Sequence, residues 1–356
     1  MATPVGVVRR REVDAGPRIA CIAPAVAALL YPVALLTLYG AGRLVHDARS
    51  VESTLAAWTV TLGAAALVYS VPAIAFWAIR VLGQEQHPSP AHFRARGFAH
   101  LAFASPPLFT ALGVAFYLMH SSSDHLTWAL IWLPIVVVAV IGERRRVAVG
   151  SGPRTQLPSL RGAHGLSAIA ILTVFLAPHL VNHLTAIWSA DLHKAVMDVL
   201  RAVYRQNAVQ SILVGLFLFQ IVSGIVLLRR RIGAPDDTLG SLQTASGAYL
   251  AAFIASHLMA VFILGRQFLH VDTNWDFAAG APAGLMGDPW NVRLIPHYSL
   301  AVFLLFAHVA CGARAVLLGH QVTLCAANRT GGAVMILGAL IALIITLAML
   351  GLHASA

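Results

Sequence analysis

Charged side chains are scarce in this sequence. Of its 356 residues only 11% are Asp, Glu, Lys or Arg, whereas 58% are hydrophobic, and the mean hydropathy is +0.77. Soluble domains typically carry about 25% charged residues. The composition therefore excludes an ordinary soluble protein and predicts an integral membrane protein that is surrounded by a lipid bilayer.

Cysteine is also rare, and its spacing matches no cofactor motif. The three cysteines, Cys21, Cys311 and Cys325, form no CxxC or CxxCH pattern. Covalent attachment of haem c uses CxxCH, and iron–sulfur clusters are held by several cysteines. We therefore expect neither kind of cofactor on this chain.

Catalytic and transport signatures are missing as well. The sequence shows no nucleophile, metal-hydrolase or nucleotide-binding motif. The apolar segments contain no Asp or Glu, and no Gly- or Pro-broken helices recur at matched positions in two halves, which argues against a transporter. The net charge of +10 comes from arginines in loops, so we expect no nucleic-acid partner.

What the chain does contain is a series of long apolar runs. A transmembrane helix needs roughly 20 predominantly apolar residues. The first run is longer than the apolar core of a signal peptide, so we expect a retained helix. The sequence predicts an all-α, polytopic helical bundle of about nine transmembrane helices, which begin near Ile19, Leu55, Gly97, Leu126, Gly165, Ala208, Gly247, Pro296 and Gly331.

A polar linker divides these runs into two groups. Residues 143–161, ERRRVAVGSGPRTQLPSLR, have the Gly, Pro and charge content of a connection between modules. We therefore predict an N-terminal four-helix membrane module of unknown role over residues 1–150. A five-helix module follows over residues 158–356.

The arginines indicate the orientation. Their clusters precede the first span and follow the second, fourth and sixth, so all lie on one side if nine helices alternate. The positive-inside rule assigns that side to the cytoplasm. We expect a cytoplasmic N-terminus and a bacterial cytoplasmic (inner) membrane. The clusters are Arg9–Arg11; Arg94 and Arg96; Arg144–Arg146, Arg154 and Arg161; and Arg229–Arg231.

Histidines inside apolar helices are the candidate site. His179 lies near the outer end of the fifth span, about four turns after His164, so both rings can share one helix face. His257 lies in the outer half of the seventh span, and His183 follows His179 by one turn. Two histidines at matching depth can fill both axial positions of one haem b. A single membrane histidine can instead be an interhelical hydrogen-bond partner.

A second pair is incomplete. Gln220 and His308 fall in the inner half of the sixth and eighth spans, and each is followed four residues later by glycine, Gly224 or Gly312. A small residue one turn from a ligand lets a flat macrocycle lie against the helix. Glutamine is a poor haem ligand, so the inner site is empty, five-coordinate on His308, or used for something else. We expect one haem b, held by His179 and His257.

These residues resemble the membrane anchor of succinate dehydrogenases and fumarate reductases, the cytochrome b subunit in its five-helix, single-chain form with two b haems. The first anchor helix of that family starts with an RxH-like element and bears a ligand fifteen residues after its histidine. Arg161, His164 and His179 match this pattern. The second and fourth family helices carry HxxxG, matched by Gln220 with its histidine replaced, and by His308.

The third helix of that family begins LQRxTG and carries a ligand ten residues after its glycine. Leu242, Gln243, Gly247 and His257 match it, with Thr244 in place of the arginine. The resemblance covers residues 158–354. It implies that Arg161, His164, His183 and Gln220 belong to the cofactor-binding set beside the three ligand candidates.

The resemblance also implies partners. It points to quinone in the membrane and to flavoprotein and iron–sulfur subunits on the cytoplasmic face, while residues 1–150 have no counterpart. We therefore expect an electron-transfer subunit without catalytic activity of its own, which exchanges electrons with quinone or a redox partner. The alternative is a non-redox membrane scaffold or lipid-handling protein that kept the anchor fold, because one ligand of the inner pair is missing.

Overall fold

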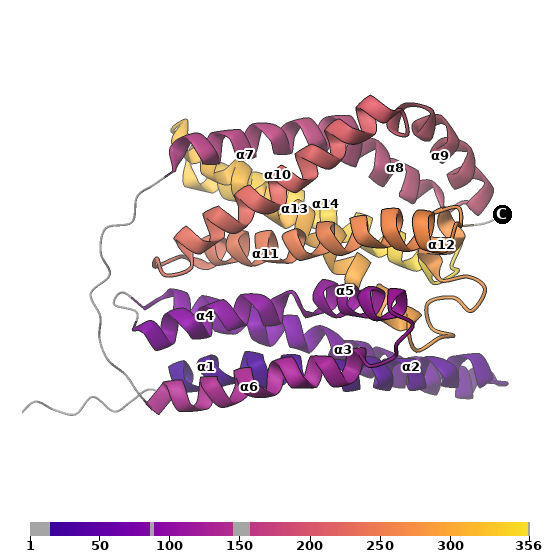
Figure 1. Ribbon diagram of the computed structural model, residues 1–356, viewed down its shortest axis with the longest axis horizontal. Helices are drawn as coiled ribbons and strands as arrows, with labels where there is room; N and C mark the ends of the chain where they lie inside the picture. Colours follow the sequence, from indigo (N-terminus) through magenta and orange to yellow (C-terminus); the bar gives the residue numbers. More distant parts are fainter. Residues whose placement is uncertain (1–14, 86–88, 145–156, 355–356) are drawn as a thin grey trace, which may run out of the picture.

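The computed structural model describes residues 15–85, 89–144 and 157–354 (Figure 1). Throughout these ranges the chain is helical and contains no strand. Seven helices are long and apolar enough to cross a membrane, and two bent helix pairs raise the number of candidate spans to nine. The predicted all-α polytopic bundle is therefore confirmed. The predicted arginines Arg9–Arg11, Arg145, Arg146 and Arg154, and most of the predicted linker, lie outside the described residues.

The N-terminal module consists of six helices. Two of its four predicted spans are each split into two helices, at Leu30 and at Ala104. The helices are α1 (Ala15–Leu29), α2 (Tyr31–Asp47), α3 (Val51–Gly83), α4 (Pro90–Phe103), α5 (Ser105–Leu118) and α6 (Asp124–Arg144).

Proline explains where these splits fall. Helices α1 and α2 meet at 50°, and α4 and α5 meet at 66°. Pro32 lies in the first turn of α2, and Pro106 with Pro107 lie in the first turn of α5. Proline has no backbone N–H and its ring clashes with the preceding turn, so it starts a helix easily and weakens one that it interrupts. Pro24 and Pro72 nevertheless lie inside α1 and α3. Each bent pair counts as one of the nine predicted spans.

The second module forms five spans with short helices between them. Pro158–Thr185, Thr238–Phe268 and Asn291–Gly319 each run continuously through a change of helix type. The elements are α7 (Pro158–Ile171), η1 (Leu172–Leu176), α8 (Ala177–Thr185), α9 (Ala190–Tyr204), α10 (Asn207–Arg231), α11 (Thr238–Leu258), η2 (Met259–Phe268), α12 (Trp275–Ala279), η3 (Asn291–Arg293), α13 (Leu294–Gly319) and α14 (Leu324–Met349).

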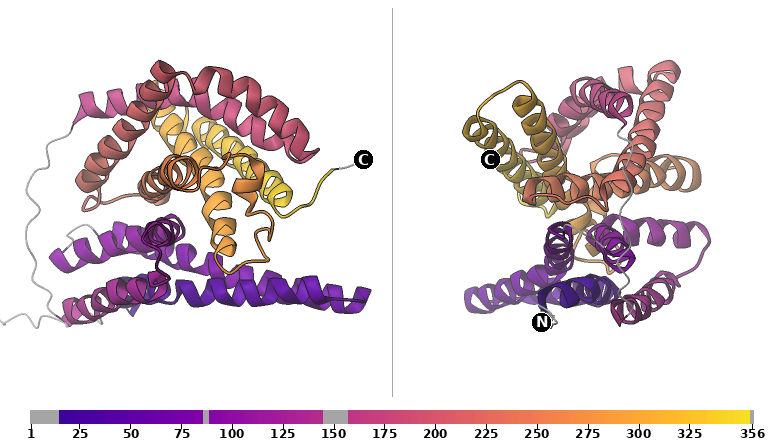
Figure 2. Two further views of the ribbon diagram at one scale, coloured as in Figure 1. Left: turned by 45° about the vertical axis from the view of Figure 1, so that its right-hand side comes forward. Right: turned by 90° about the vertical axis from the view of Figure 1, so that its left-hand side faces the viewer.

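Both ends of the bundle have a distinct character. The starts of α4, α7 and α11 and the end of α10 lie together, on the left of Figure 1, and we call this the basic end because Arg96, Arg161 and Arg231 lie in these turns. The opposite end carries α9 and α12, and we call it the cap end. Figure 2 shows the N-terminal module as one layer and the second module as another.

The helices of the second module are packed unequally. α11 packs against α3, α4 and α5, and α13 packs against α14 and α5, whereas α7 packs mainly against α10. Only 6% of the most apolar stretch of Pro158–Thr185 is buried, compared with 39% in α3. Outward side chains such as Leu166 and Val174 are exposed to the surroundings, as lipid-facing residues of a membrane helix are.

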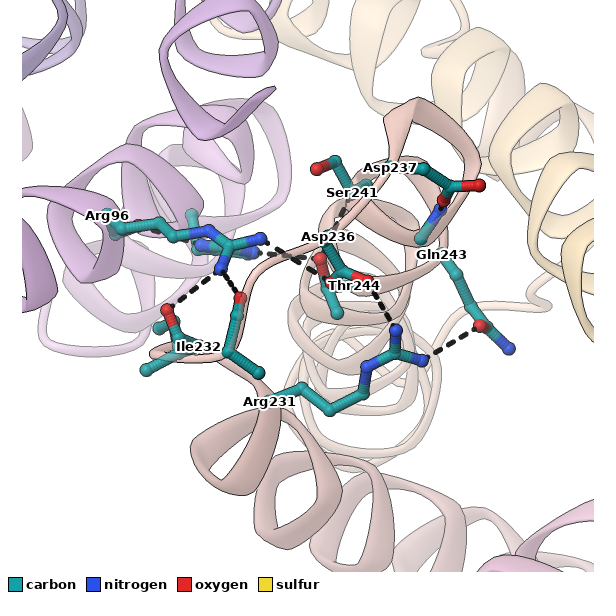
Figure 3. Close-up of polar contacts among 11 residues, drawn as sticks. Arg96, Arg231, Ile232, Asp236, Asp237, Ser241, Gln243 and Thr244 are labelled. Atoms are coloured by element: carbon teal, nitrogen blue, oxygen red, sulfur yellow. Dashed lines mark hydrogen bonds and ion pairs between the residues drawn. The ribbon is translucent and has the colours of Figure 1, made fainter. Parts of the chain in front are cut away.

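At the basic end, Arg96 of α4 joins the two modules (Figure 3). Its guanidinium donates hydrogen bonds to the carbonyl oxygens of Ile232 (3.1 Å) and Ala234 (2.6 Å) and faces the carboxylate of Asp236 at 3.5 Å. Arg231 pairs with the same carboxylate. Because the Arg96 side chain is 3% exposed, these contacts satisfy a buried charge.

At the cap end, Arg293 of η3 joins the two modules in the same way. Its guanidinium contacts the Asp124 carboxylate of α6 at 2.8 Å, and the two side chains are only 3% and 8% exposed. The guanidinium also lies over the Phe109 ring, 4.5 Å from its centre. A buried ion pair of this kind is costly to break because the remaining charge keeps no partner.

We predict that Asp124→Asn destabilises the protein by about 3–5 kcal/mol, because it leaves Arg293 buried without its counter-charge. Unfolding in a mild detergent, followed by circular dichroism, measures the change. The matched control is Asp198→Asn, which removes an exposed ion pair with Lys194 of comparable length (2.6 Å) and should cost no more than about 1 kcal/mol. Equal losses in both variants would contradict the assigned role of Arg293.

Candidate functional site

Two histidines face each other near the cap end. His179 of α8 and His257 of α11 have ring centres 6.4 Å apart, with the ring planes at 67°. The main packing partners of their helices differ: α8 packs chiefly against α9 and η1, and α11 chiefly against α13 and α10. The two rings therefore reach toward each other across the interior of the second module.

Each of these rings is backed by a phenylalanine one turn earlier. Phe175 stacks on His179 with ring centres 5.0 Å apart and planes at 18°, and Phe253 stacks on His257 at 5.4 Å and 14°. Stacking limits the rotation of both imidazoles. The sequence signal is FxxxH, which occurs at both positions and which the sequence analysis did not use.

The helix carrying each histidine changes its winding beside it. The π-helical segment η1 ends three residues before His179, and η2 begins two residues after His257. Such segments are rare within α-helices and frequently occur at functional sites. The regular 3.6-residue period assumed from the sequence gave no indication of them.

His179 and His257 have different hydrogen bonding. Nε2 of His179 lies 3.1 Å from Nε2 of His183, so one of the two nitrogens donates to the other. His257 has no hydrogen bond within the described part of the chain, and its Nδ1 is fully buried. A buried, unpaired imidazole nitrogen is energetically costly, and Nδ1 of His183, His193 and His297 is in the same state.

Short helices at the cap end close over His183. His193 of α9 and Trp275 of α12 lie against it, with ring centres 5.3 Å and 5.9 Å away. The Asn182 amide donates a hydrogen bond to Nε2 of His193 at 3.1 Å. His193 and Trp275 were not predicted as site residues; the amphipathic pattern of residues 190–204 was the only signal for the first.

A second facing pair lies toward the basic end. His164 of α7 and His308 of α13 have ring centres 6.5 Å apart and planes at 79°. The HxxxG spacing predicts Gln220 opposite His308. In the structure the Gln220 amide donates instead to the His164 carbonyl oxygen at 2.8 Å and to the Ser167 hydroxyl at 2.6 Å. Arg161 is exposed in the first turn of α7.

The spacing of the cap-end pair fits a metal ion between two imidazoles. Metal–imidazole bonds are about 2 Å long, so the centres of two rings on opposite sides of one metal lie roughly 6 Å apart. The separation of 6.4 Å between His179 and His257 agrees with this value. His179 must release His183 before its Nε2 is free for a metal. The described residues contain no cluster of three or more His, Cys, Asp or Glu that suits a bare metal ion.

Comparison with known protein families, with curated proteins and with solved structures finds no match for this chain. The site is therefore interpreted from its own geometry.

His193 gives a test of the cap-end packing. Burial, and to a smaller extent the positive charge of Arg201, lowers the pKa of His193 from 6.5 to about 4. The unfolded chain then binds more protons than the folded chain between these values. The contribution of neutral, buried His193 to the stability of the fold is therefore complete above pH 6.5, and it declines as the pH falls toward 4.

We predict that the melting temperature of His193→Gln falls less steeply than that of the wild type between pH 6.5 and about 4, since glutamine does not titrate. Thermal melts in detergent across this range measure the difference. His320→Gln is the control, because His320 is exposed, and its curve should run parallel to the wild type. If the curve of His193→Gln were also parallel to that of the wild type, His193 would not be held neutral by burial at the cap end.

Proposed function

We propose that this protein is a membrane b-type cytochrome whose cap-end site holds one haem b between His179 and His257. The observation that carries the proposal is the ring separation of 6.4 Å between two imidazoles on helices whose main packing partners lie elsewhere. Phe175 and Phe253 support both rings. An interhelical hydrogen bond would bring two imidazoles closer together than this.

A haem b bound there supplies one-electron redox chemistry. His179 and His257 would hold the haem from its two faces, and the chemistry that such a bis-histidine haem would supply is electron transfer. His183 then loses its partner nitrogen on His179, and its own neighbours His193 and Trp275 hold it beside the site. α9 and α12 limit the access of water to the cap end.

We further propose a quinol as the membrane electron donor or quinone as the acceptor, on the resemblance to the succinate dehydrogenase and fumarate reductase anchor. Oxidation of one quinol releases two electrons and two protons, and the electrons pass one at a time. Flavoprotein and iron–sulfur subunits would bind at the basic end, which lies in the cytoplasm if the membrane is a bacterial cytoplasmic membrane.

The test is the visible spectrum of the protein purified in mild detergent after expression with ample haem. We expect a b-type reduced-minus-oxidised spectrum, and we expect His179→Ala and His257→Ala each to lose the equivalent of one haem per chain because an axial ligand is gone. His320→Ala, an exposed histidine, is the matched control and should keep the full spectrum. A colourless wild type, or full haem content in both ligand variants, would rule out the proposed site.

A further inference from the structure

The second histidine pair carries an inference of its own. Resting on the proposed function of the cap-end site, we propose that His164 and His308 form a second haem b site, in which His164 supplies the ligand that the HxxxG pattern placed at Gln220. The ring centres are 6.5 Å apart, which is again the spacing expected for two imidazoles on one metal, roughly 6 Å.

The tautomer of His308 is fixed by its surroundings. Nδ1 lies 3.1 Å from the carbonyl oxygen of Gln243 and 3.1 Å from the hydroxyl of Ser246. A carbonyl oxygen only accepts hydrogen bonds, so Nδ1 carries the proton. Nε2 is therefore left with its lone pair, which is the form that binds a metal.

The same reasoning applies to His164. Its Nδ1 lies 2.8 Å from the hydroxyl of Ser223, and that hydroxyl donates its only proton to the carbonyl oxygen of Phe219. The hydroxyl must then accept from Nδ1–H, so the lone pair of His164 is also on Nε2. Metal-binding histidines characteristically donate their other N–H to such a partner, which orients the ring.

Both Nε2 atoms are available. No hydrogen bond within the described residues involves Nε2 of His164 or of His308, in contrast to His179, whose Nε2 contacts His183. The pair at the basic end is thus the better prepared of the two. It needs no hydrogen bond to break before a metal binds.

Gln220 has a supporting role in this arrangement. Its amide bridges from α10 to the backbone of His164 and to Ser167, and Ser223 of the same helix orients the imidazole. Gln220 therefore fixes the turn of α7 that presents His164, and both of its hydrogen bonds are to α7 groups.

Two glycines make room for the rings. A Cβ on Gly224 would lie 3.5 Å from Cε1 of His164, and a Cβ on Gly247 would lie 3.1 Å from Cε1 of His308. The imidazoles lie close against α10 and α11 as a result. Gly224 is the glycine of the QxxxG pattern, and in the structure its lack of a side chain leaves room for the His164 ring.

The two sites lie in series across the membrane. His164 and His179 are fifteen residues apart on one span, which corresponds to about 22 Å along a helix axis. The hydrocarbon core of a bilayer is about 30 Å thick. Two haems at these positions would connect the basic end with the cap end, so that one chain could carry electrons across the membrane.

The experiment is the ratio of haem to protein, measured by pyridine haemochrome assay on the full chain. We expect about two haems per chain in the wild type and about one in His164→Ala and His308→Ala, with the cap-end haem retained as an internal check that each variant is folded. Added imidazole should refill the space left in His164→Ala and restore its low-spin ferric electron paramagnetic resonance signal. His320→Ala, at an exposed histidine outside both pairs, is the matched control and should keep two haems.

The outcomes separate the two proposals. One haem that is lost in His179→Ala but kept in His164→Ala would overturn the second site and leave the first intact. One haem that is lost in His164→Ala but kept in His179→Ala would support the second site and overturn the first. Loss of a haem in Gln220→Ala with full retention in His164→Ala would assign the ligand to Gln220 and contradict the inference.

Discussion

The constraint that organises this structure is the cost of a polar ring inside a lipid-embedded bundle. Water cannot satisfy an imidazole at that depth, so each buried histidine must find a partner in the protein or bind a cofactor. Four of the buried histidines form two facing pairs, His179 with His257 and His164 with His308. Stacked phenylalanines hold the first pair, and serine hydroxyls hold the second.

The N-terminal module holds one histidine of each pair in place by packing against its helix. It packs along α11 and α13, the helices of His257 and His308, and the buried charges of Arg96 and Arg293 join the modules at both ends. The other histidine of each pair comes from the single span Pro158–Thr185, in which only 6% of the most apolar stretch is buried. Cofactor binding would therefore tie a lipid-facing span to a rigid pair of helices, which gives a structural reason for the first four spans.

The sequence predicted those features that the bilayer itself dictates. The length of the apolar runs predicted nine segments, because a helix must cross the hydrocarbon. The equal depth of His179 and His257 in their spans predicted that the two histidines face each other. The bends of 50° at Leu30 and 66° at Ala104 could not be predicted in position or size, because proline only permits a break and packing decides its angle. The partner of His308 was not predictable from HxxxG spacing, since the choice between Gln220 and His164 depends on which α7 groups the Gln220 amide contacts.

Anomalous X-ray diffraction at the iron absorption edge, on crystals of the full chain, tests the central claim most directly. The account predicts an iron peak between the rings of His179 and His257, with planar density around it. A second peak would lie between His164 and His308. Well-ordered imidazoles with no iron between either pair, or iron bound elsewhere in the chain, would contradict it.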